Sequence, residues 1–436
     1  MKEKYYLKCA ACGHITPDFG QWFNQNQICP KCEGKHAEVW YKSDYKELST
    51  LWNSSPESFW HYHSFLPLDD AGNKITCNEG AVPIEKWDFL QDFAEKKYGI
   101  KCEVVIYRND LNGGTGTFKD VAAALAAAVL KEHGIKQYVV ASTGNTATAF
   151  ARYLALAGIH CSVFIPDNTL KSSEAYISAF GQTVYRVNGD YAFTKSVAAK
   201  YARDNNILIS SGNIDPMRVE AKKTMVFEWL RQLKKLPDVY IQAISGGTGP
   251  IAIDKGVKEL KGFSEGIKNP RFIMVQPDRC APMTMAWEKA EKNGFPEGFE
   301  KDYPIIDNPQ TCVPTLGTGN PATYPLLAGL VKKSGGTFVT VDENKLVNFG
   351  KLMAFERKVL FGPASAVCMA GFFKALEKNL IKNGETVLVN LGEGVMRAPD
   401  FVYQMMDAAS LINGVEECTH HEISDYRQAI WDGILA

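Results

Sequence analysis

The hydrophobic pattern of the chain changes character near residue 100. From there on, short apolar runs alternate with longer stretches whose apolar residues recur at helical spacing. The short runs are rich in Val, Ile, Phe and Tyr, which favours strands. They are EVVIY (103–107), QYVVA (137–141), CSVFI (161–165), YIQAI (240–244), FIMVQ (272–276) and TVLVNL (386–391).

Helices of ten to twenty residues are predicted between these strands. The alternation of strand and helix predicts βαβ units and an α/β fold with a mostly parallel sheet. Loops after the strands are rich in Gly, Ser and Thr, and such loops form the ligand crevice at the carboxyl ends of the strands. The pattern is weakest over 262–322, where Pro, Gly and charged residues interleave. The predicted helices span 118–132, 145–157, 192–204, 216–234, 250–261, 344–357 and 364–377.

Residues 1 to about 36 form a small unit with a cysteine pattern. Two Cys-x2-Cys pairs are separated by sixteen residues, and each is followed closely by a glycine, in CAACG (9–13) and CPKCEG (29–34). This spacing predicts a structural zinc site rather than disulfides, with a metal-free remnant as the alternative. The other seven cysteines are expected to be small buried side chains. The predicted metal ligands are Cys9, Cys12, Cys29 and Cys32.

Composition and charge narrow the class of partner. The chain has 436 residues, 45% hydrophobic and 22% charged, with a formal net charge of -1. This balance shows no electrostatic footprint for nucleic acid or an anionic membrane. The longest apolar run, Val121 to Leu130, is too short to span a bilayer, and MKEKYYLKC lacks the apolar core of a signal peptide. We therefore expect a cytoplasmic protein that captures anions through local groups.

A lysine stands where an alanine-rich helix begins, in NGGTGTFKDVAAALAAAVL (112–130). A helix N-terminus carries about half a positive charge and repels a cation, so Asp, Ser or Thr is the ordinary choice. We expect Lys119 to lose its proton more easily than a lysine in water. An uncharged amine at the end of a glycine loop suits a lysine that forms a Schiff base.

Further loops offer anion-binding groups. In STGNT (142–146), hydroxyls, an amide and backbone N–H groups at a helix start can hold a carboxylate, whereas a plain helix cap would need only one such residue. SGGTG (245–249) predicts a phosphate cradle, although glycine turns at strand ends are common. LGEG (391–394) is a fourth glycine loop after a strand.

A cluster of cations and amides follows a short strand in SSGNIDPMRVEAKKT (210–224). Asn213 and the fork-shaped guanidinium of Arg218 could hold a second phosphate. The alternative is a solvated helix face. We expect that alternative for Lys222 and Lys223, and both interpretations stay open for Arg218.

Four of these motifs, in this order, resemble the pyridoxal-phosphate (PLP) enzymes of fold type II, and the threonine synthases most. The motifs are GTGTFKD (114–120), ASTGNTA (141–147), SGGTGP (245–250) and GPASAVCMAG (362–371), and LGTGNPAT (316–323) resembles a further loop of that family. The resemblance covers the chain from about residue 79. It implies a tryptophan synthase β-like fold with two open twisted α/β domains and the site between them. The implied domains are the zinc ribbon at 1–36, a large domain at 37–120 and 236–436, and a small domain at 121–235.

The resemblance also implies roles for individual residues. Lys119 would hold the cofactor as a Schiff base and shuttle protons, and Asn145 would hydrogen-bond the 3'-oxygen of the pyridine ring. Three further groups are implied: Ser245, Gly246, Gly247, Thr248 and Gly249 for the cofactor phosphate; Ser142, Thr143 and Thr146 for the substrate carboxylate; and Asn213 and Arg218 for a departing phosphate.

Some positions depart from the threonine synthase pattern. Gly362 stands where that family has an acidic residue before PASA, and Leu391 stands where a Ser or Thr usually faces the pyridine nitrogen. Asn390 or Glu393 could take over the latter role. Val121 replaces an arginine that often follows FKD. Because threonine formation needs several extra proton transfers, these departures argue against ordinary threonine synthase chemistry.

Within the family, the chain resembles the cysteate synthases in several segments: LKCAACG (7–13), WHYHSFLP (60–67), QAISGGTG (242–249), APMTMAW (281–287) and PASAV (363–367). This resemblance implies a β-replacement in which O-phospho-L-serine and sulfite give L-cysteate and phosphate. GTFKD and STGNTA look more like threonine synthase, which keeps the reaction of O-phospho-L-homoserine with water as an alternative. A PLP-binding relative with little turnover, used for sensing or scaffolding, is a third. A homodimer is the expected default.

Overall fold

The computed structural model describes residues 4–42, 52, 55–262, 266–405 and 422–435. Six strands build its larger sheet in the order β12-β11-β10-β13-β5-β4. All neighbours run parallel except β4 and β5, which pair antiparallel. The strands are β4 (Ile84–Lys86), β5 (Glu103–Tyr107), β10 (Val239–Ala243), β11 (Arg271–Pro277), β12 (Thr337–Val341) and β13 (Thr386–Asn390).

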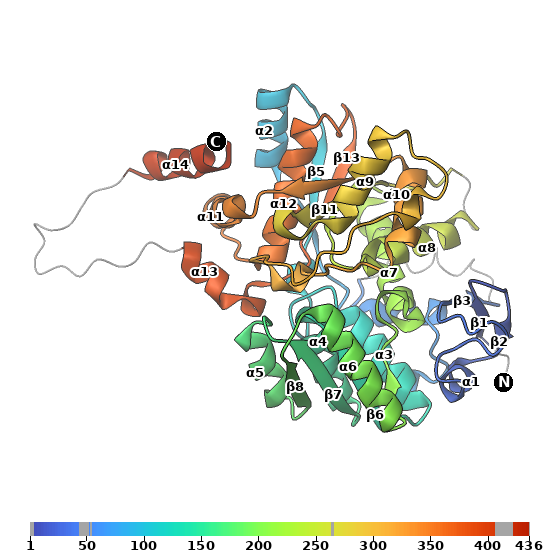
Figure 1. The fold of residues 1–436 in the computed structure, drawn as a ribbon. Helices are drawn as coiled ribbons and strands as arrows, with labels where there is room; N and C mark the ends of the chain where they lie inside the picture. Colours follow the sequence, from blue (N-terminus) through green and yellow to red (C-terminus); the bar gives the residue numbers. More distant parts are fainter. Residues whose placement is uncertain (1–3, 43–51, 53–54, 263–265, 406–421, 436) are drawn as a thin grey trace, which may run out of the picture.

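Helices cover both faces of this sheet, as a parallel sheet requires (Figure 1). Successive side chains of a strand point to opposite faces of the sheet, and each face has its own core. One core includes residues of α2, α11 and α12, and the other includes residues of α7, α8, α9 and α10. These helices are α2 (Asp88–Tyr98), α7 (Pro216–Leu233), α8 (Thr248–Lys261), α9 (Pro282–Lys292), α10 (Tyr324–Ser334), α11 (Leu346–Arg357) and α12 (Pro363–Glu377).

The smaller sheet has four parallel strands in the order β8-β7-β6-β9. It lies below the larger sheet in Figure 1, and α3 and α7 pack together where the two layers meet. Its strands are β6 (Gln137–Ala141), β7 (His160–Pro166), β8 (Thr183–Val187) and β9 (Leu208–Ile209), and its helices are α3 (Asp120–Glu132), α4 (Asn145–Leu156), α5 (Lys171–Ala179) and α6 (Tyr191–Asp204).

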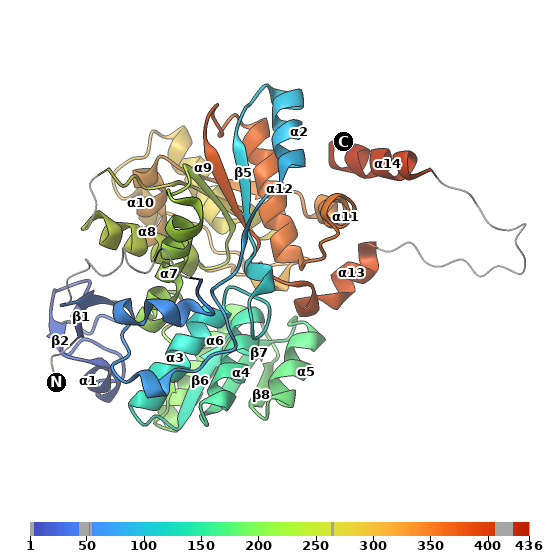
Figure 2. The same cartoon turned by 180° about the vertical axis from the view of Figure 1, so that it is seen from behind.

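The N-terminal unit is a three-stranded antiparallel sheet of β1 (Tyr5–Cys9), β2 (Ile15–Thr16) and β3 (Ala37–Tyr41), with α1 (Phe19–Asn24) against it. It lies beside α3 and α7 in both views (Figures 1 and 2). β3 pairs with β1 along its whole length, so this sheet extends beyond residue 36. The division of the chain into domains at 36, 120 and 235 stays a prediction.

The six predicted strands are confirmed, and the seven predicted helices occur with ends shifted by a few residues. β8 and β12 were missed. Most of β8 is half-buried or exposed, so its sequence TVYRV lacks a continuous apolar run. β12, at the edge of the larger sheet, was missed because two threonines interrupt the apolar residues of its sequence TFVTV. The other helices that the prediction missed include α2, α5, α9, α10, α13 (Pro399–Met405) and α14 (Ile423–Leu435).

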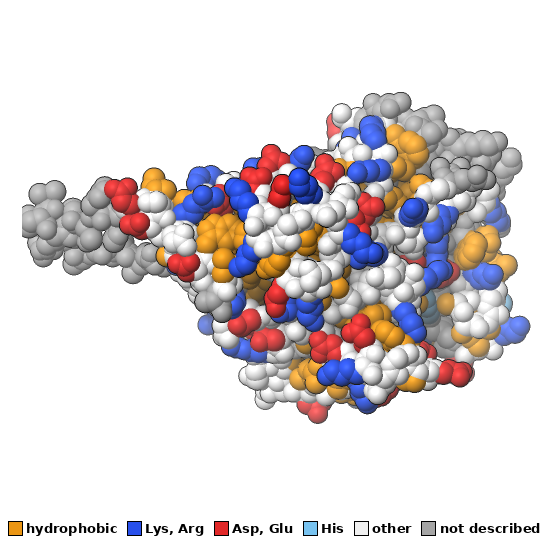
Figure 3. Space-filling model, turned by 90° about the horizontal axis from the view of Figure 1, so that it is seen from above, with side chains coloured by type: hydrophobic (Ala, Val, Ile, Leu, Met, Phe, Trp, Pro, Cys, Tyr) orange, Lys and Arg blue, Asp and Glu red, His pale blue; other side chains and the backbone are white. Residues whose placement is uncertain are grey.

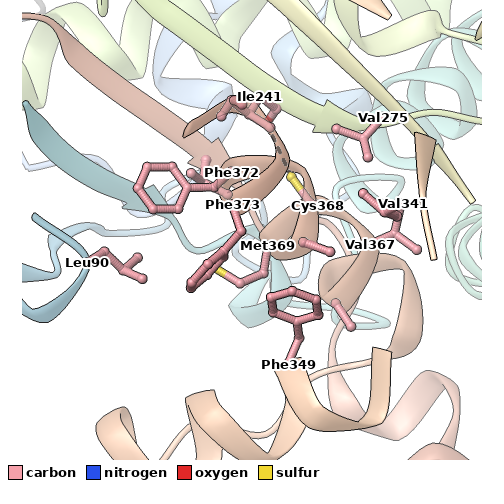
Figure 4. Packing of buried hydrophobic residues seen from close by; sticks show 14 of the residues in the cluster. Leu90, Ile241, Val275, Val341, Phe349, Val367, Cys368, Met369, Phe372 and Phe373 are labelled. Carbon is pink, nitrogen blue, oxygen red and sulfur yellow. Dashed lines mark hydrogen bonds between the residues drawn. The ribbon is translucent and has the colours of Figure 1, made fainter. Parts of the chain in front are cut away.

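The packing of α12 on the larger sheet places its N-terminus at the carboxyl edge of the strands. Cys368 points at β10 and donates a hydrogen bond from Sγ to the carbonyl of Ile241 at 3.3 Å (Figure 4). Phe372 and Met369 are fully buried in the same cluster. Of the seven cysteines predicted to be small buried side chains, Cys102, Cys161, Cys280 and Cys368 are buried and Cys77 is half-buried. The prediction is wrong for Cys312, which is exposed, and Cys418 lies outside the described residues.

Two surface features bear on the expected environment of the protein. On the face drawn in Figure 3, basic and acidic side chains are interspersed rather than gathered by sign. Within the described part of the chain, none of the helices combines the length and the apolar character needed to cross a bilayer.

The contact between α12 and β11 gives a test of this packing. A Cβ added at Gly371 would lie 2.3 Å from Cγ2 of Val275, whereas one added at the exposed Gly329 of α10 meets nothing within 4 Å. Chemical denaturation should show Gly371→Ala to be destabilised by roughly 1–3 kcal/mol through overpacking. Gly329→Ala, the matched control in a helix, should gain about 0.5–1 kcal/mol. Equal effects of the two changes would contradict the described packing.

Candidate active site

A pocket opens between the two sheets, at the carboxyl ends of their strands. It encloses about 850 Å³ including its mouth. Loops that follow β6, β9, β10 and β13 supply its walls, which is where ligands bind in open parallel sheets. The pocket brings together every predicted cofactor and substrate residue: Lys119, Ser142, Thr143, Asn145, Thr146, Asn213, Arg218, Ser245, Gly246, Gly247, Thr248, Gly249 and Asn390.

Lys119 is the N-cap residue of α3, as the sequence predicted. The loop before it is held by Asp120, whose carboxylate accepts hydrogen bonds from the backbone N–H groups of Thr115 and Thr117 at 3.0 and 2.9 Å. Gly114 and Gly116 have φ values of 89° and 72°, which favour glycine. The loop thereby turns sharply and delivers the lysine side chain into the pocket.

Burial, with a smaller contribution from the neighbouring Arg218, lowers the pKa of Lys119 to about 7, and Glu393 opposes the shift. The expected direction of the shift therefore agrees with the structure. The physical cause differs from the one argued from the sequence, because removal from water outweighs the charge of any single neighbour. At neutral pH a substantial fraction of Lys119 is an uncharged amine.

The loop at 245–249 needs its glycines for side-chain room as well as backbone freedom. A Cβ on Gly246 would lie 1.7 Å from Nδ2 of Asn213, and one on Gly249 would lie 2.3 Å from Oε1 of Gln242. Gly247 has φ 79° and caps α8. The three glycines line the pocket at the start of α8, and a glycine-rich helix start is the kind of place where backbone N–H groups bind a phosphate. Asn213 lies against this cradle, where it accepts a hydrogen bond from Thr248 at 2.6 Å.

The loop at 142–146 uses part of its polar groups on itself. The hydroxyl of Ser142 accepts from the backbone N–H groups of Gly144 and Ala147 at 3.2 and 3.1 Å. Thr146 accepts a hydrogen bond from Nη2 of Arg218 at 3.0 Å. The remaining N–H groups at the start of α4 face the pocket. They can hold a carboxylate, as the sequence indicated.

Arg218 lies in the pocket wall rather than on a solvated face. Its side chain is 6% exposed and its Nη1 donates to the carbonyl of Gly212 at 2.8 Å. Its Nε is buried without a hydrogen-bond partner. A guanidinium with an unsatisfied donor beside the pocket can bind an anion such as phosphate.

The expectation that Lys222 and Lys223 are solvated is wrong. Both are fully buried, because α7 is buried from Pro216 to Leu230 between the ribbon, α3 and α8. Lys223 pairs with Glu220 at 2.6 Å and with Glu259 at 2.8 Å. Lys222 has no hydrogen-bond partner, and its Nζ lies 4.8 Å from the ring centroid of Phe118. Burial, followed by Lys119 and Arg218, lowers the pKa of Lys222 well below its ordinary value.

Asn390 ends β13 at the pocket wall. Its Oδ1 accepts from Nδ2 of Asn109 at 2.7 Å, while its own Nδ2 is buried without a partner. Asn109 is in turn fixed by Nδ2 of Asn112, which donates to Oδ1 of Asn109 at 2.8 Å. Asn390 therefore has an unsatisfied donor, and it is one of the two residues expected to face the pyridine nitrogen.

Two residues of the pocket lining, Glu393 and Thr315, had no firm assignment from the sequence, and neither had Arg397, which lies behind the lining residue Asn145. Glu393 was named only as a possible partner of the pyridine nitrogen. It is 1% exposed and accepts from Asn145 Nδ2 at 2.5 Å. Arg397 is equally buried and donates to Asn145 Oδ1 at 3.2 Å and to Ser173 at 2.9 Å, which ties the C-terminal segment to α4 and α5. Burial lowers the pKa of Arg397. Thr315 comes from the stretch whose pattern was weakest.

The WHYHSFLP segment does not reach the pocket. Residues 59–65 form a 3-10 helix against α7, where Tyr62 donates to Glu228 at 2.7 Å. His61 and His63 are absent from the pocket lining within the described residues. Burial lowers the pKa of His63 to about 4, so it stays uncharged.

The four predicted metal ligands converge in the N-terminal unit. The sulfur atoms of Cys9, Cys12, Cys29 and Cys32 all lie within 4.8 Å of one another. They come from two turns that face each other, with Sγ–Sγ distances of 3.6 Å between Cys9 and Cys32 and between Cys12 and Cys29. Four sulfur atoms so placed form a donor set that suits tetrahedral zinc.

The ribbon also touches the segment that carries Arg218. Gln27 donates from Nε2 to the carbonyl of Ile209 at 2.8 Å and accepts from Ser211 at 3.0 Å. Gln27 lies two residues before Cys29 and is buried. The cysteine cluster therefore supports the start of the loop that leads into Asn213 and Arg218.

Residues 75–392 match the family described as pyridoxal-phosphate dependent enzyme. The chain belongs to this family of PLP-dependent enzymes. A threonine synthase of Methanocaldococcus jannaschii is 29% identical over 87% of the chain and 92% of its own length. A threonine synthase of Methanosarcina acetivorans is 27% identical over 94% of the chain and 96% of its own length.

Solved structures agree on the fold. An L-serine ammonia-lyase from Rhizomucor miehei superposes with a TM-score of 0.60 at 16% identity, over 75% of this chain and 99% of that one. An O-ureido-L-serine-bound mutant of O-ureido-L-serine synthase gives 0.59 at 15% identity, over 81% of this chain and 96% of that one. Together with the family match, these structures establish PLP fold type II as the fold of the chain.

The pocket fits the cofactor of this family. An uncharged lysine amine can bind an aldehyde, the cradle of three glycines at the start of α8 can bind a phosphate, and Asn390 holds a buried donor without a partner. These three features match the aldehyde, the phosphate and the ring nitrogen of PLP. The assignment of individual residues to these contacts remains a prediction.

The buried amine of Lys222 gives a pH-dependent prediction. Its pKa in the folded protein lies well below the value of 10.5 that it has in the unfolded chain, so burial of the amine costs stability below 10.5, and that cost fades as pH rises toward 10.5. Lys222→Met should therefore raise the free energy of unfolding at pH 7, and between the two pKa values the gain should fall by about 1.4 kcal/mol for each unit of pH. The gain should shrink with rising pH in denaturation experiments. The exposed Lys200→Met serves as control, and a pH-independent effect at Lys222 would contradict its burial as a free amine.

Proposed function

We propose that this PLP-dependent enzyme expels inorganic phosphate from an O-phosphorylated amino acid. The supporting observation is Arg218, a buried guanidinium at the pocket wall with an unsatisfied Nε. The cofactor cradle at 245–249 lies elsewhere in the pocket, so Arg218 is available for a second anion. The N–H groups of the 142–146 loop would hold the substrate carboxylate, as the family resemblance implies.

Bound PLP supplies the electron sink that makes loss of a proton from Cα possible. The residues around it bind, orient and move protons. Lys119 would take the proton from Cα and later return it. With a pKa of about 7, it can do both at neutral pH. Arg218 would hold the phosphate in place as it leaves and match the charge that develops on its oxygens.

The first candidate reaction is the formation of L-cysteate from O-phospho-L-serine and sulfite, with release of phosphate. The motifs at 60–67, 242–249 and 281–287 support it. The positive charge that Arg218 supplies beside the pocket also suits a reaction in which one anion departs and another arrives. Only one C–O bond at Cβ has to be exchanged for a C–S bond, so Lys119 suffices for the proton transfers.

The second candidate is the formation of L-threonine from O-phospho-L-homoserine and water. The curated relatives named threonine synthase support it, since they align over 87% and 94% of the chain. The loops GTFKD and STGNTA support it as well. The two substrates differ by one methylene, and a difference of this size is worth only about 1–3 kcal/mol in a binding pocket.

We also propose that the cysteine cluster holds a structural zinc ion. The four ligands complete a tetrahedral set and leave no open position for chemistry. Sulfite as co-substrate, a homodimer and a cytoplasmic location remain part of the proposal.

A phosphate-release assay tests the proposed function. Purified enzyme loaded with PLP should release inorganic phosphate from phosphoserine only when sulfite is present, and mass spectrometry should identify L-cysteate. Arg218→Lys should lower kcat/KM roughly ten- to hundredfold, because a charged hydrogen bond is worth about 1.5–3 kcal/mol. Arg203→Lys, at an exposed position of α6, should have no effect, and Lys119→Ala should abolish release.

Other outcomes decide between the candidates. Release from phosphohomoserine alone, with threonine as product, would establish the second reaction and exclude the first. Intact cofactor binding with no release from either substrate would exclude both and favour a sensing or scaffolding role.

The zinc proposal predicts a loss of metal on removal of one ligand. Elemental analysis of the purified wild-type protein should find about one zinc ion per chain, and Cys9→Ser should lose most of it. Cys161→Ser, at a buried cysteine outside the cluster, should retain the metal. Unchanged zinc content in Cys9→Ser would contradict the site.

A further inference from the structure

One buried carboxylate in the pocket wall has no role in the chemistry described above. Glu393 follows β13 and is 1% exposed. Its Oε2 accepts hydrogen bonds from Asn145 Nδ2 at 2.5 Å and from Thr315 Oγ1 at 2.9 Å, and its Oε1 accepts from the backbone N–H of Ala364 at 3.1 Å. These three donors satisfy both oxygens of the buried carboxylate.

The backbone of Glu393 is clamped as firmly as its side chain. Its N–H donates to Oγ of Ser365 at 2.9 Å, and its carbonyl accepts from the same hydroxyl at 2.8 Å. The N–H of Gly362 also donates to that carbonyl at 3.0 Å. These bonds join Glu393 to the start of α12, whose positive end favours an anion. The helix position is fixed in turn by the core of the larger sheet.

Gly362 is a glycine because of Glu393. The backbone of Gly362 has φ -81° and ψ 169°, which any residue can adopt, so conformational freedom does not explain it. A Cβ at this position would instead lie 2.3 Å from Oε1 and 2.7 Å from Cγ of Glu393. A side chain at position 362 would therefore occupy the same space as the side chain of Glu393. The threonine synthase pattern has an acidic residue at position 362, whereas in this chain the carboxylate in that space belongs to Glu393.

The carboxylate acts on two groups that the proposed chemistry needs. The backbone of Glu393 pairs with Thr117, two residues before Lys119, through an isolated β-bridge, and both Glu393 and Lys119 line the pocket. Glu393 is a favourable charge for a protonated Lys119, whereas Arg218 is an unfavourable one. On its other side, Glu393 holds the amide of Asn145, whose oxygen is bound by Arg397.

We propose that Glu393 is a positioning residue that supplies the counter-charge to Lys119 and orients Asn145, and that it can do so only because position 362 has no side chain. The inference rests on the proposed role of Lys119 as the reacting amine. The carboxylate of Glu393 would stabilise the protonated amine of Lys119 although Arg218 lies nearby. Without Glu393, a proton that Lys119 takes from Cα would add a positive charge beside Arg218, and the carboxylate that now balances these charges would be missing. Asn145 would also lose the carboxylate that orients its amide.

The shared volume is tested by a cycle of stability measurements on the full chain. Gly362→Ala should lower the denaturation midpoint clearly in the wild-type protein. In a Glu393→Gly background the same change should cost little, because the competing atoms are gone. An equal loss in both backgrounds would refute the shared volume.

The counter-charge is tested by measuring protonation of Lys119 without substrate. Labelling of Lys119 in the cofactor-free protein by an amine reagent, followed by mass spectrometry across pH, gives the midpoint at which the amine loses its proton. Glu393→Gln keeps the shape of the side chain and removes the charge, so the midpoint should fall by about one unit, a typical effect of one neighbouring charge. Glu174→Gln, a carboxylate paired with Arg186 outside the pocket, should leave the midpoint unchanged.

Moving the carboxylate from position 393 to position 362 tests whether its charge, rather than the packing of Glu393, sets the pKa of Lys119. The variant Gly362→Asp/Glu393→Gly returns an acid to the same volume from the other side and should restore most of the midpoint of Lys119. An unchanged midpoint in Glu393→Gln, or no recovery in a stably folded double variant, would overturn the proposal. Because neither measurement uses a phosphorylated substrate, failure here is distinct from failure of the phosphate-release assay.

Discussion

A lysine amine that is buried beside other cations must give up its proton, and much of the structure around Lys119 serves that condition. Arg218 and Lys222 lie on one face of α7, one helical turn apart. Arg218 disfavours an ammonium group at Lys119, and Lys119 and Arg218 disfavour one at Lys222. Glu393, in the pocket wall, is the carboxylate that opposes the shift at Lys119, while Asp120 holds the loop and has its own pKa raised to about 7 by burial. The reactivity of Lys119 thus depends on interactions between nearby charges, and these interactions are strong because the protein interior excludes water.

The fold places these charged residues in the pocket between the two sheets, at the carboxyl ends of their strands. Each sheet contributes loops that begin helices, so backbone N–H groups converge from α4 and α8 without any need for extra cations. Arg397 crosses from the C-terminal segment to α4 and α5, which joins the two layers around the pocket. The pocket is therefore a property of the relative position of the layers, which the apolar packing of α3 against α7 and a few buried polar contacts hold in place.

The glycine loops and the lysine could be predicted because their chemistry is local: a strand, a turn and a helix start follow one another within ten residues. Glu393 and Arg397 could not be assigned in the same way. Their partners Asn145 and Thr315 lie far away in the sequence, and a glutamate in a glycine loop carries no sign of burial. Lys222 and Lys223 were misplaced for a related reason. The layers that cover α7 come from the ribbon, α3 and α8, so the polarity of α7 alone indicates solvent where there is none.

The contact between Gln27 and the segment Ile209–Ser211 has a consequence for the metal itself. One end of this segment is supported by the four-cysteine unit, and the other end leads to the guanidinium that faces the pocket. If metal binding at the cysteines orders Arg218, an anion bound to Arg218 strengthens metal binding by the same factor, because coupling between two binding equilibria is reciprocal.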